Sequence, residues 1–123
     1  MLYYIKPIDI KYYIGDEFMI IEINRENYDK VLHHTETPLV VEFYSPTCVH
    51  CKKTERGINE LSEELGDTVT FAKCNIFENE SLAALYDISN LPTLLFIKND
   101  EIKDKLIGFT HKLIIAENIK KLN

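Results

Sequence analysis

The stretch Thr47-Cys48-Val49-His50-Cys51-Lys52-Lys53 lies between a run of apolar, strand-favouring residues and a helical pattern. Two cysteines three residues apart on a helix lie on the same side of it. Their Cα atoms are then roughly 5–6 Å apart, which is within reach of a disulfide. Unpaired backbone N–H groups at a helix N-terminus favour an anion such as a thiolate. The stretch therefore predicts a cysteine with a lowered pKa and nucleophilic character.

Composition favours one globular domain and argues against several classes of partner. The chain has 123 residues, 46% of them hydrophobic, which is enough for a substantial core and does not indicate disorder. The net charge is −6 and no basic patch is evident, so we expect no binding to nucleic acid. No apolar run reaches the ~18 residues of a membrane span, so we expect no membrane insertion.

Cysteine usage indicates a reducing compartment. Three cysteines are an odd number and too few for a scaffold of disulfides. The opening segment Met1–Asp9 has no continuous apolar core and no small-residue cleavage site, so we expect no secretory signal. Catalytic thiols in a cytoplasmic protein fit this pattern, and we expect a cytoplasmic monomer.

Residues 1–18 are predicted to form an N-terminal extension of a domain that covers residues 19–123. The segment Ile8–Tyr12 alternates with period two, as a half-buried strand does, and Gly15-Asp16 can turn it into a hairpin. A second interpretation is that Met19 is the native start, because codons for Gly15-Asp16 can spell a ribosome-binding sequence. Mass spectrometry of the native protein would decide between the two.

Strands and helices are predicted to alternate along the rest of the chain. Strands are expected at residues 20–23, 39–44, 69–76, 93–97 and 102–107, and helices at about 24–34, 48–65, 79–86 and 110–122. Asn24 and Thr110 are polar residues typical of helix N-caps. Lys98–Glu101 is predicted to be a hairpin turn. This order predicts an α/β fold in which helices flank a central mixed β-sheet.

The first and last helices have predicted apolar faces. Tyr28, Val31 and Leu32 are expected on the apolar side of the first helix, and His33 and His34 on the surface of its last turn, where a positive charge suits the helix dipole. The last helix is expected to carry the apolar residues Leu113, Ile114, Ile115, Ile119 and Leu122.

Several segments together resemble the thioredoxin family. They are Val40–Lys52, Phe71–Ile76 and Tyr86–Asn99, with Gly108 before the last helix. The first segment is closest to protein disulfide isomerase domains, which also carry Glu and His at the positions of Glu42 and His50. The resemblance runs roughly from Met19 to Leu122. It implies a thioredoxin fold with a short N-terminal extension, protein disulfides as substrates and a disulfide reductase as electron donor.

The two cysteines are expected to play different parts in disulfide exchange. Cys48, at the start of the helix, attacks a substrate disulfide and forms a mixed disulfide. Cys51, one turn deeper, attacks that intermediate and releases the reduced substrate. The redox-active Cys48–Cys51 disulfide takes the place of a cofactor in this interpretation, and no metal is expected.

Glu42 is predicted to manage the proton of Cys51. It is an acid within the apolar run 39–44, and burial raises the pKa of a carboxyl until it can exchange protons near neutrality. Glu42 is therefore expected to accept the proton that Cys51 loses. The family pattern places Lys73 as the charge partner of Glu42.

Four further residues are expected to set substrate contacts and reactivity. The resemblance implies a cis peptide before Pro92, with Pro92 against the cysteine pair. Leu91 and Pro92 then supply a backbone edge for an extended substrate peptide. Thr47 stands where the family usually has Trp, so part of the flat apolar contact for substrate is missing. The imidazole of His50 can stabilise a thiolate on Cys48.

Cys74 and two alternative functions complete the interpretation. Strand alternation places Cys74 on the opposite face of the strand from Phe71 and Lys73. It is interpreted as a small buried hydrophobe or, alternatively, as a regulatory thiol. Beside the oxidoreductase, one alternative is a zinc site made by Cys48 and Cys51 with Cys74 or a histidine. That site lacks a second Cys-x-x-Cys and histidines at ligand spacing. The other alternative is a binding module of the same fold whose thiols are idle.

Overall fold

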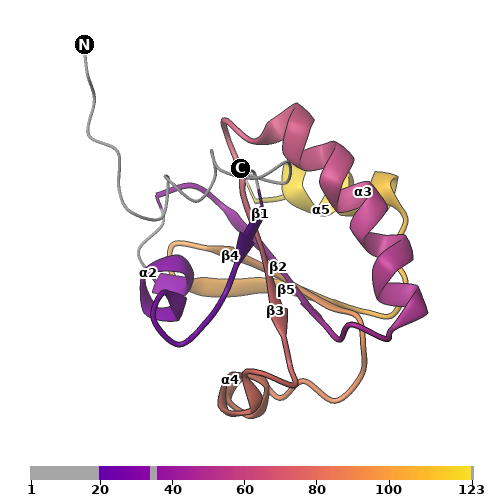
Figure 1. Cartoon of the computed structure of the whole chain (residues 1–123). Helices are drawn as coiled ribbons and strands as arrows, with labels where there is room; N and C mark the ends of the chain where they lie inside the picture. The colour runs from indigo at the N-terminus through magenta and orange to yellow at the C-terminus, as the bar shows by residue number, and fades with distance from the viewer. Residues whose placement is uncertain (1–19, 34–35, 123) are drawn as a thin grey trace.

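The structure is a computed structural model that describes residues 20–33 and 36–122. The predicted extension 1–18, its hairpin, Met19 and His34 lie outside the described residues, so the domain boundary at residue 19 stays a prediction. In chain order the elements are β1 (Ile20–Glu22), α2 (Tyr28–His33), β2 (Leu39–Tyr44), α3 (Val49–Leu65), β3 (Thr70–Asn75), α4 (Glu80–Leu85), β4 (Thr93–Lys98), β5 (Glu101–Ile107) and α5 (Lys112–Lys120) (Figure 1). The predicted alternation of strands and helices is confirmed.

The five strands form one mixed sheet in the order β1-β3-β2-β4-β5. Strands β1, β3 and β2 run parallel, β4 runs antiparallel to β2, and β5 runs antiparallel to β4. The central strand is therefore β2, which pairs with β3 on one side and β4 on the other. This arrangement confirms the predicted α/β fold with a central mixed sheet.

The hairpin between β4 and β5 has the predicted two-residue turn. Lys98 pairs with Glu101, and between them Asn99 and Asp100 have φ values of 53° and 68°. Asn and Asp tolerate this left-handed backbone better than most residues do. Nδ1 of His33, exposed at the end of α2 as predicted, lies 2.8 Å from Oδ1 of Asp100 and ties the turn to that helix.

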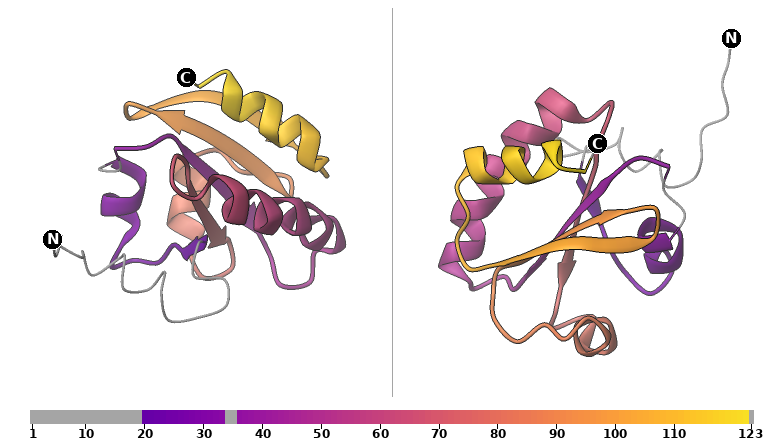
Figure 2. Two further views of the ribbon diagram at one scale, coloured as in Figure 1. Left: turned by 90° about the horizontal axis from the view of Figure 1, so that it is seen from above. Right: turned by 180° about the vertical axis from the view of Figure 1, so that it is seen from behind.

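Helices cover both faces of the sheet and create two cores. Helices α3 and α5 lie on one face and α2 and α4 on the other (Figure 2). Strand β2 serves both cores, because Val40 faces α3 and α5 while Val41 and Phe43 face α2 and α4. None of the helices in the described part of the chain combines the length and apolar character needed to span a membrane.

The first described helix starts later than the sequence predicts. The side chain of Asn24 accepts hydrogen bonds from the backbone N–H groups of Glu26 and Asn27, both at 2.9 Å, and so caps a turn that leads into α2. Tyr28, expected on the apolar side, is 37% exposed, whereas Val31 and Leu32 are buried as predicted. Asn24 therefore caps this turn rather than α2 itself, which begins at Tyr28.

The last helix also departs from the prediction at its start. Its N-cap is His111, whose Nδ1 accepts a hydrogen bond from the N–H of Leu113 at 3.1 Å. Thr110 is not the cap: its hydroxyl donates to the carbonyl oxygen of Gly108 at 3.1 Å, and its N–H donates to Oγ1 of Thr54 at 3.2 Å. Leu113 and Ile114 lie in the helix as predicted, but they are 65% and 49% exposed and do not belong to its buried face. The remaining predicted members, Ile115, Ile119 and Leu122, are buried.

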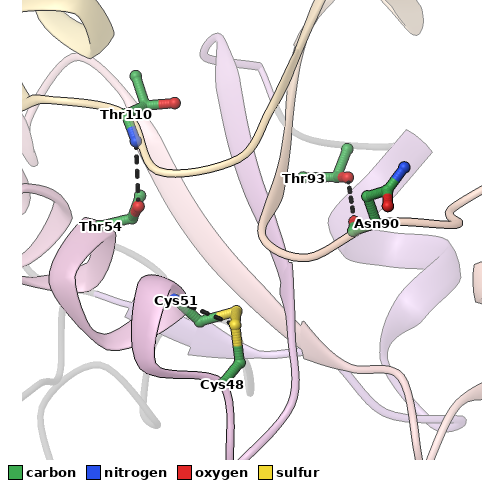
Figure 3. The surroundings of a disulfide bond; sticks show 6 residues. All are labelled: Cys48, Cys51, Thr54, Asn90, Thr93 and Thr110. Atoms are coloured by element: carbon green, nitrogen blue, oxygen red, sulfur yellow. Dashed lines mark hydrogen bonds between the residues drawn. A yellow bond between two sulfur atoms is a disulfide. The ribbon is translucent and has the colours of Figure 1, made fainter.

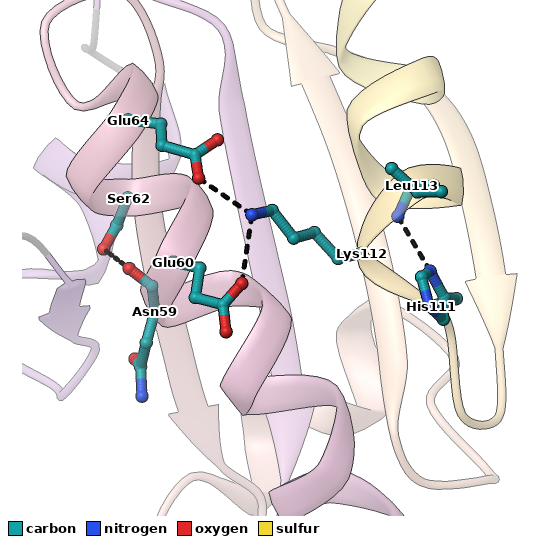
Figure 4. Close-up of polar contacts among 7 residues, drawn as sticks. All are labelled: Asn59, Glu60, Ser62, Glu64, His111, Lys112 and Leu113. Carbon is teal, nitrogen blue, oxygen red and sulfur yellow. Dashed lines mark hydrogen bonds and ion pairs between the residues drawn. The ribbon is translucent and has the colours of Figure 1, made fainter.

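The start of α5 packs closely against the middle of α3. Nζ of Lys112 lies 3.0 Å from Oε1 of Glu60 and 2.8 Å from Oε2 of Glu64 (Figure 4). A Cβ atom added at Gly57 would meet Cβ of Lys112 at 3.0 Å and its Cα at 3.2 Å. Because real Cβ contacts are rarely that short, the absence of a side chain at Gly57 lets the two helices approach.

Replacing Gly57 with alanine is expected to destabilise the protein. Alanine in a helix interior usually gains about 1 kcal/mol over glycine, but here its Cβ must displace the backbone of α5, and overpacking costs about 1–3 kcal/mol. We expect a net loss of about 1 kcal/mol in the free energy of unfolding, measured by urea denaturation. Gly66→Ala is the control, because Gly66 has ordinary right-handed dihedrals (φ −58°, ψ −22°) that alanine adopts without strain. A Gly57→Ala variant as stable as wild type would contradict this packing argument.

Candidate active site

The junction between β2 and α3 presents the two cysteines. Cys48 is the N-cap of α3, and its Sγ accepts a hydrogen bond from the N–H of Cys51 at 3.2 Å. The N–H of Cys48 in turn donates to the carbonyl oxygen of Ser45 at 3.2 Å, which closes the turn before the helix. Cys48 and Cys51 form a disulfide with Cα atoms 5.2 Å apart (Figure 3). The spacing predicted from the sequence is confirmed.

The two cysteines differ in their access to solvent. Cys51 is fully buried, whereas Cys48 is partly exposed and its neighbours Val49 and His50 are exposed. A large partner can therefore reach the sulfur of Cys48 but not that of Cys51. This difference matches the predicted division between an attacking thiol and a deeper, resolving one.

The segment before β4 lies in the surroundings of the disulfide. The peptide between Leu91 and Pro92 is cis, as the resemblance implies. The carbonyl oxygen of Pro92 accepts a hydrogen bond from the N–H of Gly108 at 2.8 Å. Oγ1 of Thr93 donates to the carbonyl oxygen of Asn90 at 2.6 Å (Figure 3). These bonds anchor the segment at both ends.

The residues expected to bind substrate differ in exposure. Pro92 is buried, Leu91 is partly buried and Thr47 is exposed. Their roles in substrate binding, and the placing of Pro92 against the cysteines, stay predictions.

Glu42 is a buried acid in the centre of the sheet. It is 1% exposed, and within the described residues neither of its side-chain oxygens makes a hydrogen bond. Burial raises the pKa of Glu42 to about 9, and the nearby carboxyl of Glu55 raises it as well, while the charge of Lys73 lowers it. The predicted burial and raised pKa are confirmed, and the role as proton acceptor for Cys51 stays a prediction.

Lys73 forms its ion pair with a different acid from the one expected. Its Nζ lies 4.0 Å from Oε1 of Glu22 on β1 and 5.4 Å from the centre of the Tyr44 ring. The hydroxyl of Tyr44 donates to both carboxylate oxygens of Glu22 at 3.0 Å. Lys73 is the sheet neighbour of Glu42, and its charge still acts on that carboxyl. The expected partnership is therefore present only as a longer-range effect.

Three residues around Glu42 were not predicted from the sequence. Glu22 lies two strands away, Tyr44 lies two residues further along the same strand, and Glu55 is the residue four positions after Cys51 on α3. Burial raises the pKa of Glu22, which the bonds from Tyr44 and the charge of Lys73 oppose. Glu22 stands in an apolar run as Glu42 does, but only the register of the parallel strands reveals that the two acids flank one lysine.

Cys74 lies apart from the disulfide, on the other face of the sheet. It is fully buried in the core beneath α2 and α4, as the alternation of β3 predicts. Burial and the charge of Glu22 raise the pKa of Cys74 to about 12, which makes its thiol a poor nucleophile near neutrality. The interpretation as a small buried hydrophobe is confirmed.

Across residues 20–33 and 36–122, no three His, Cys, Asp or Glu side chains are grouped as metal ligands would be.

Comparison with known proteins indicates one family. Residues 19–121 match the family model described as Thioredoxin. The chain is 34% identical over 99 residues to "Thioredoxin M-type, chloroplastic" of Pisum sativum, which covers 80% of this chain and 58% of the pea protein. It is 32% identical over 103 residues to "Thioredoxin" of Rickettsia felis, covering 84% of this chain and 98% of that protein.

A third relative is a protein disulfide isomerase, the other kind of protein that the segment around Cys48 resembles. The chain is 34% identical over 85 residues to "Protein disulfide-isomerase MPD1" of Saccharomyces cerevisiae, covering 68% of this chain and 27% of the yeast protein. The chain thus spans a fraction of the yeast protein and about three-fifths of the pea protein, whereas it matches nearly the whole rickettsial protein.

The raised pKa of Glu42 makes stability depend on pH. Between about 4.5 and about 9 the folded protein keeps a proton that the unfolded chain loses, so the free energy of unfolding falls as pH rises. Glutamine at this position stays neutral. Relative to Glu42→Gln, the oxidised wild-type protein should lose up to about 1.4 kcal/mol per pH unit between pH 5 and 8.

Urea unfolding of both oxidised proteins at several pH values measures this difference. Glu63→Gln, which removes an exposed carboxylate from α3, is the control and should follow wild type. If the free energy of unfolding changed with pH equally in wild type and Glu42→Gln, Glu42 would not hold a proton in the folded state.

Proposed function

The chain belongs to the thioredoxin family, and we propose that it is a thiol–disulfide oxidoreductase that works through Cys48 and Cys51. The observation that carries the proposal is the geometry at the start of α3. One cysteine is partly exposed and caps the helix, and the other is buried one turn deeper and bonded to it. This is the arrangement that disulfide exchange requires, because one thiol meets the substrate and the other ends the reaction.

In the first step, the Cys48 thiolate attacks a disulfide of the substrate. A sulfur–sulfur bond forms between Cys48 and the substrate, the substrate disulfide breaks, and the electron pair leaves on the second substrate sulfur. The N–H of Cys51 already points at Sγ of Cys48, and a thiolate accepts this hydrogen bond more strongly than a thiol does. The helix N-terminus further favours the negative charge.

In the second step, Cys51 resolves the mixed disulfide. Its thiol transfers a proton, attacks Sγ of Cys48 and releases the substrate as a reduced thiol, which regenerates the Cys48–Cys51 disulfide. We assign the proton to Glu42, a buried acid under α3. Support for this assignment comes from Glu55, which acts on Glu42 and lies one helical turn beyond Cys51.

We propose protein disulfides as substrates and a disulfide reductase as the electron donor. Partly exposed Cys48 suits a large partner, and Val49 beside it is 64% exposed, which gives an apolar contact where Thr47 supplies none. Leu91 and Pro92 are proposed to offer the backbone edge that pairs with the substrate chain. A monomer in the cytoplasm is part of the same proposal, supported by thiols that require a reducing compartment.

Serine at each cysteine separates the two steps. Cys48→Ser should reduce insulin no faster than the dithiothreitol background, because the attacking thiolate is gone. Cys51→Ser should instead accumulate mixed disulfides with its partners, because the resolving thiol is gone. The readouts are turbidity during insulin reduction and partner trapping on non-reducing gels.

Two outcomes would contradict the proposal. One is insulin reduction by Cys48→Ser at the wild-type rate. The other is a folded Cys51→Ser protein that traps no partner. Stoichiometric zinc in the purified protein, together with loss of the fold on chelation, would favour a metal site. A folded, metal-free wild-type protein without activity would favour a binding module.

The residues between the cysteines bear on the redox potential. Val49 and His50 stand where typical thioredoxins have Gly-Pro, and an imidazole there can stabilise a thiolate on Cys48. A more stable thiolate stabilises the reduced form and raises the potential. The reduction potential of thioredoxin is about −270 mV and that of protein disulfide isomerase about −180 mV. We place the potential of this protein between about −190 and −250 mV.

Proline at position 50 should raise the pKa of Cys48 and lower the potential together. His50 lies in the first turn of α3, where proline loses no intrahelical hydrogen bond. A drop of about 30 mV, equivalent to about 1.4 kcal/mol for this two-electron couple, is expected in a glutathione equilibrium titration. His50→Gln is the control for the imidazole alone and should shift the potential in the same direction. A potential that stays unchanged or becomes more oxidising would refute this role of His50.

A further inference from the structure

Lys73 lies between two acids in a row that crosses three strands. In the parallel register, Glu22 of β1 pairs with Lys73 of β3, and Lys73 pairs with Glu42 of β2. Residues paired in this way point to the same face of a sheet. That face is the one covered by α3 and α5, because Phe71 and Val40, two positions earlier on β3 and β2, belong to the core beneath those helices.

The lysine is held by only one of its two acidic neighbours. Its Nζ lies 4.0 Å from Oε1 of Glu22 and 5.4 Å from the centre of the Tyr44 ring. The Tyr44 hydroxyl donates to both oxygens of Glu22 at 3.0 Å and fixes that carboxylate beside the lysine. In contrast, Glu42 has no hydrogen bond to either oxygen within residues 20–33 and 36–122, although it is more deeply buried.

The charged groups around Glu42 come from several elements and differ in the sign of their charge. Strand β1 contributes Glu22, β3 contributes Lys73, and α3 contributes Glu55. Tyr44 on the same strand bonds to Glu22, while Glu78 after β3 acts on Glu22 and Tyr44. The neighbour of Glu42 on β4 is the apolar Leu94. Because Lys73 is the only cation in this set, its position determines whether an ionised Glu42 is compensated.

We propose that Glu22 is a positioning residue for the reaction: together with Tyr44 it holds Lys73 away from Glu42 and thereby keeps Glu42 protonated in the oxidised protein. Only the effect of Glu22 on the reaction rests on the proposed function. As a statement about which acid holds the lysine, the proposal stands on the register, the ion pair and the two hydrogen bonds.

A protonated Glu42 has a definite use when the protein is itself reduced. A thiolate of the donor dithiol attacks Sγ of Cys48, the Cys48–Cys51 bond breaks, and its electron pair leaves on Sγ of Cys51. Glu42 then gives its proton to that buried thiolate, which would otherwise be left charged in the core. The second donor thiol displaces Cys48, so the donor leaves as a disulfide. In the opposite direction, the ionised Glu42 takes the proton back.

The test replaces Glu22 with glutamine and measures the protonation of Glu42 directly. Glutamine keeps an oxygen that can accept from Tyr44 but removes the charge that holds Lys73. The side-chain carboxyl of Glu42 is followed by NMR in oxidised protein with ¹³C-labelled glutamate, from pH 5 to pH 10. We expect its titration midpoint to fall by at least about half a pH unit, a threefold change in the ionisation constant. The pH midpoint of mixed-disulfide resolution should fall with it.

Two comparisons separate release of the lysine from simple loss of a negative charge. Glu78→Gln removes another acid that acts on Glu22 and Tyr44 but has no ion pair with Lys73, and it should shift the midpoint less. In a Lys73→Met background, Glu22→Gln has no lysine to release, so its effect should fall to less than half. Tyr44→Phe, which removes both bonds to Glu22 and keeps every charge, should lower the midpoint in the same direction and serves if Glu22→Gln does not fold.

An unchanged or raised midpoint in Glu22→Gln would overturn the proposal. An equally large shift in the Lys73→Met background would overturn it too, because the lysine would then play no part. The NMR titration reads one carboxyl whether or not the protein exchanges disulfides. Failure of the proposed function would instead appear in the insulin assay of the wild-type protein.

Discussion

The burial of β2 on both faces is the constraint on which the rest of the structure depends. Its position between β3 and β4 gives it paired strands on either side, and the two helical layers cover it above and below. Every residue from Leu39 to Phe43 is therefore shielded from water, including the carboxyl of Glu42. An acid in that position does not ionise at its ordinary pKa, because it is buried and no hydrogen bond within the described residues stabilises its charge.

The end of the same strand places the cysteines. The chain leaves the sheet after Tyr44, turns at Ser45, and enters α3 with Cys48 as its cap. The first sulfur thus lies at the rim of the molecule and the second lies inside it. Contacts further along α3 hold this helix in place: Thr54 accepts from the backbone of Thr110, and Gly57 lets α5 approach. The chemical difference between the two thiols is in this sense a result of packing.

The charges around Glu42 show how neighbouring strands can tune one group without touching the reacting sulfurs. A single lysine serves two acids, and Tyr44 favours one of them. The other acid, Glu42, remains in the core without a hydrogen bond to either oxygen within the described residues. A disulfide exchanger needs a group that can both give and take a proton near working pH, and an ordinary exposed carboxyl does neither well. Unequal sharing of Lys73 is one way for the sheet to supply that group.

Local pattern in the sequence was sufficient to predict most elements and the reactive pair. Alternation and apolar runs predicted all five strands, the Asn99-Asp100 turn has the residues that its backbone needs, and the Cys48–Cys51 spacing follows from helix geometry. The burial of Glu42 followed from its place in a continuous apolar run, and the face that Cys74 occupies followed from strand alternation.

Tertiary structure alone decided the partners of these residues. The pairing of Lys73 with Glu22 depends on the register between β1 and β3. These two strands are far apart in the sequence, and no local pattern encodes their register. The same holds for α5. Thr110 has the chemistry of a cap, but its hydroxyl donates to Gly108 and its N–H to Thr54, 56 positions earlier, and His111 caps the helix instead. Sequence determined which groups this protein has and which face they occupy, whereas contacts between distant segments determined which of them meet.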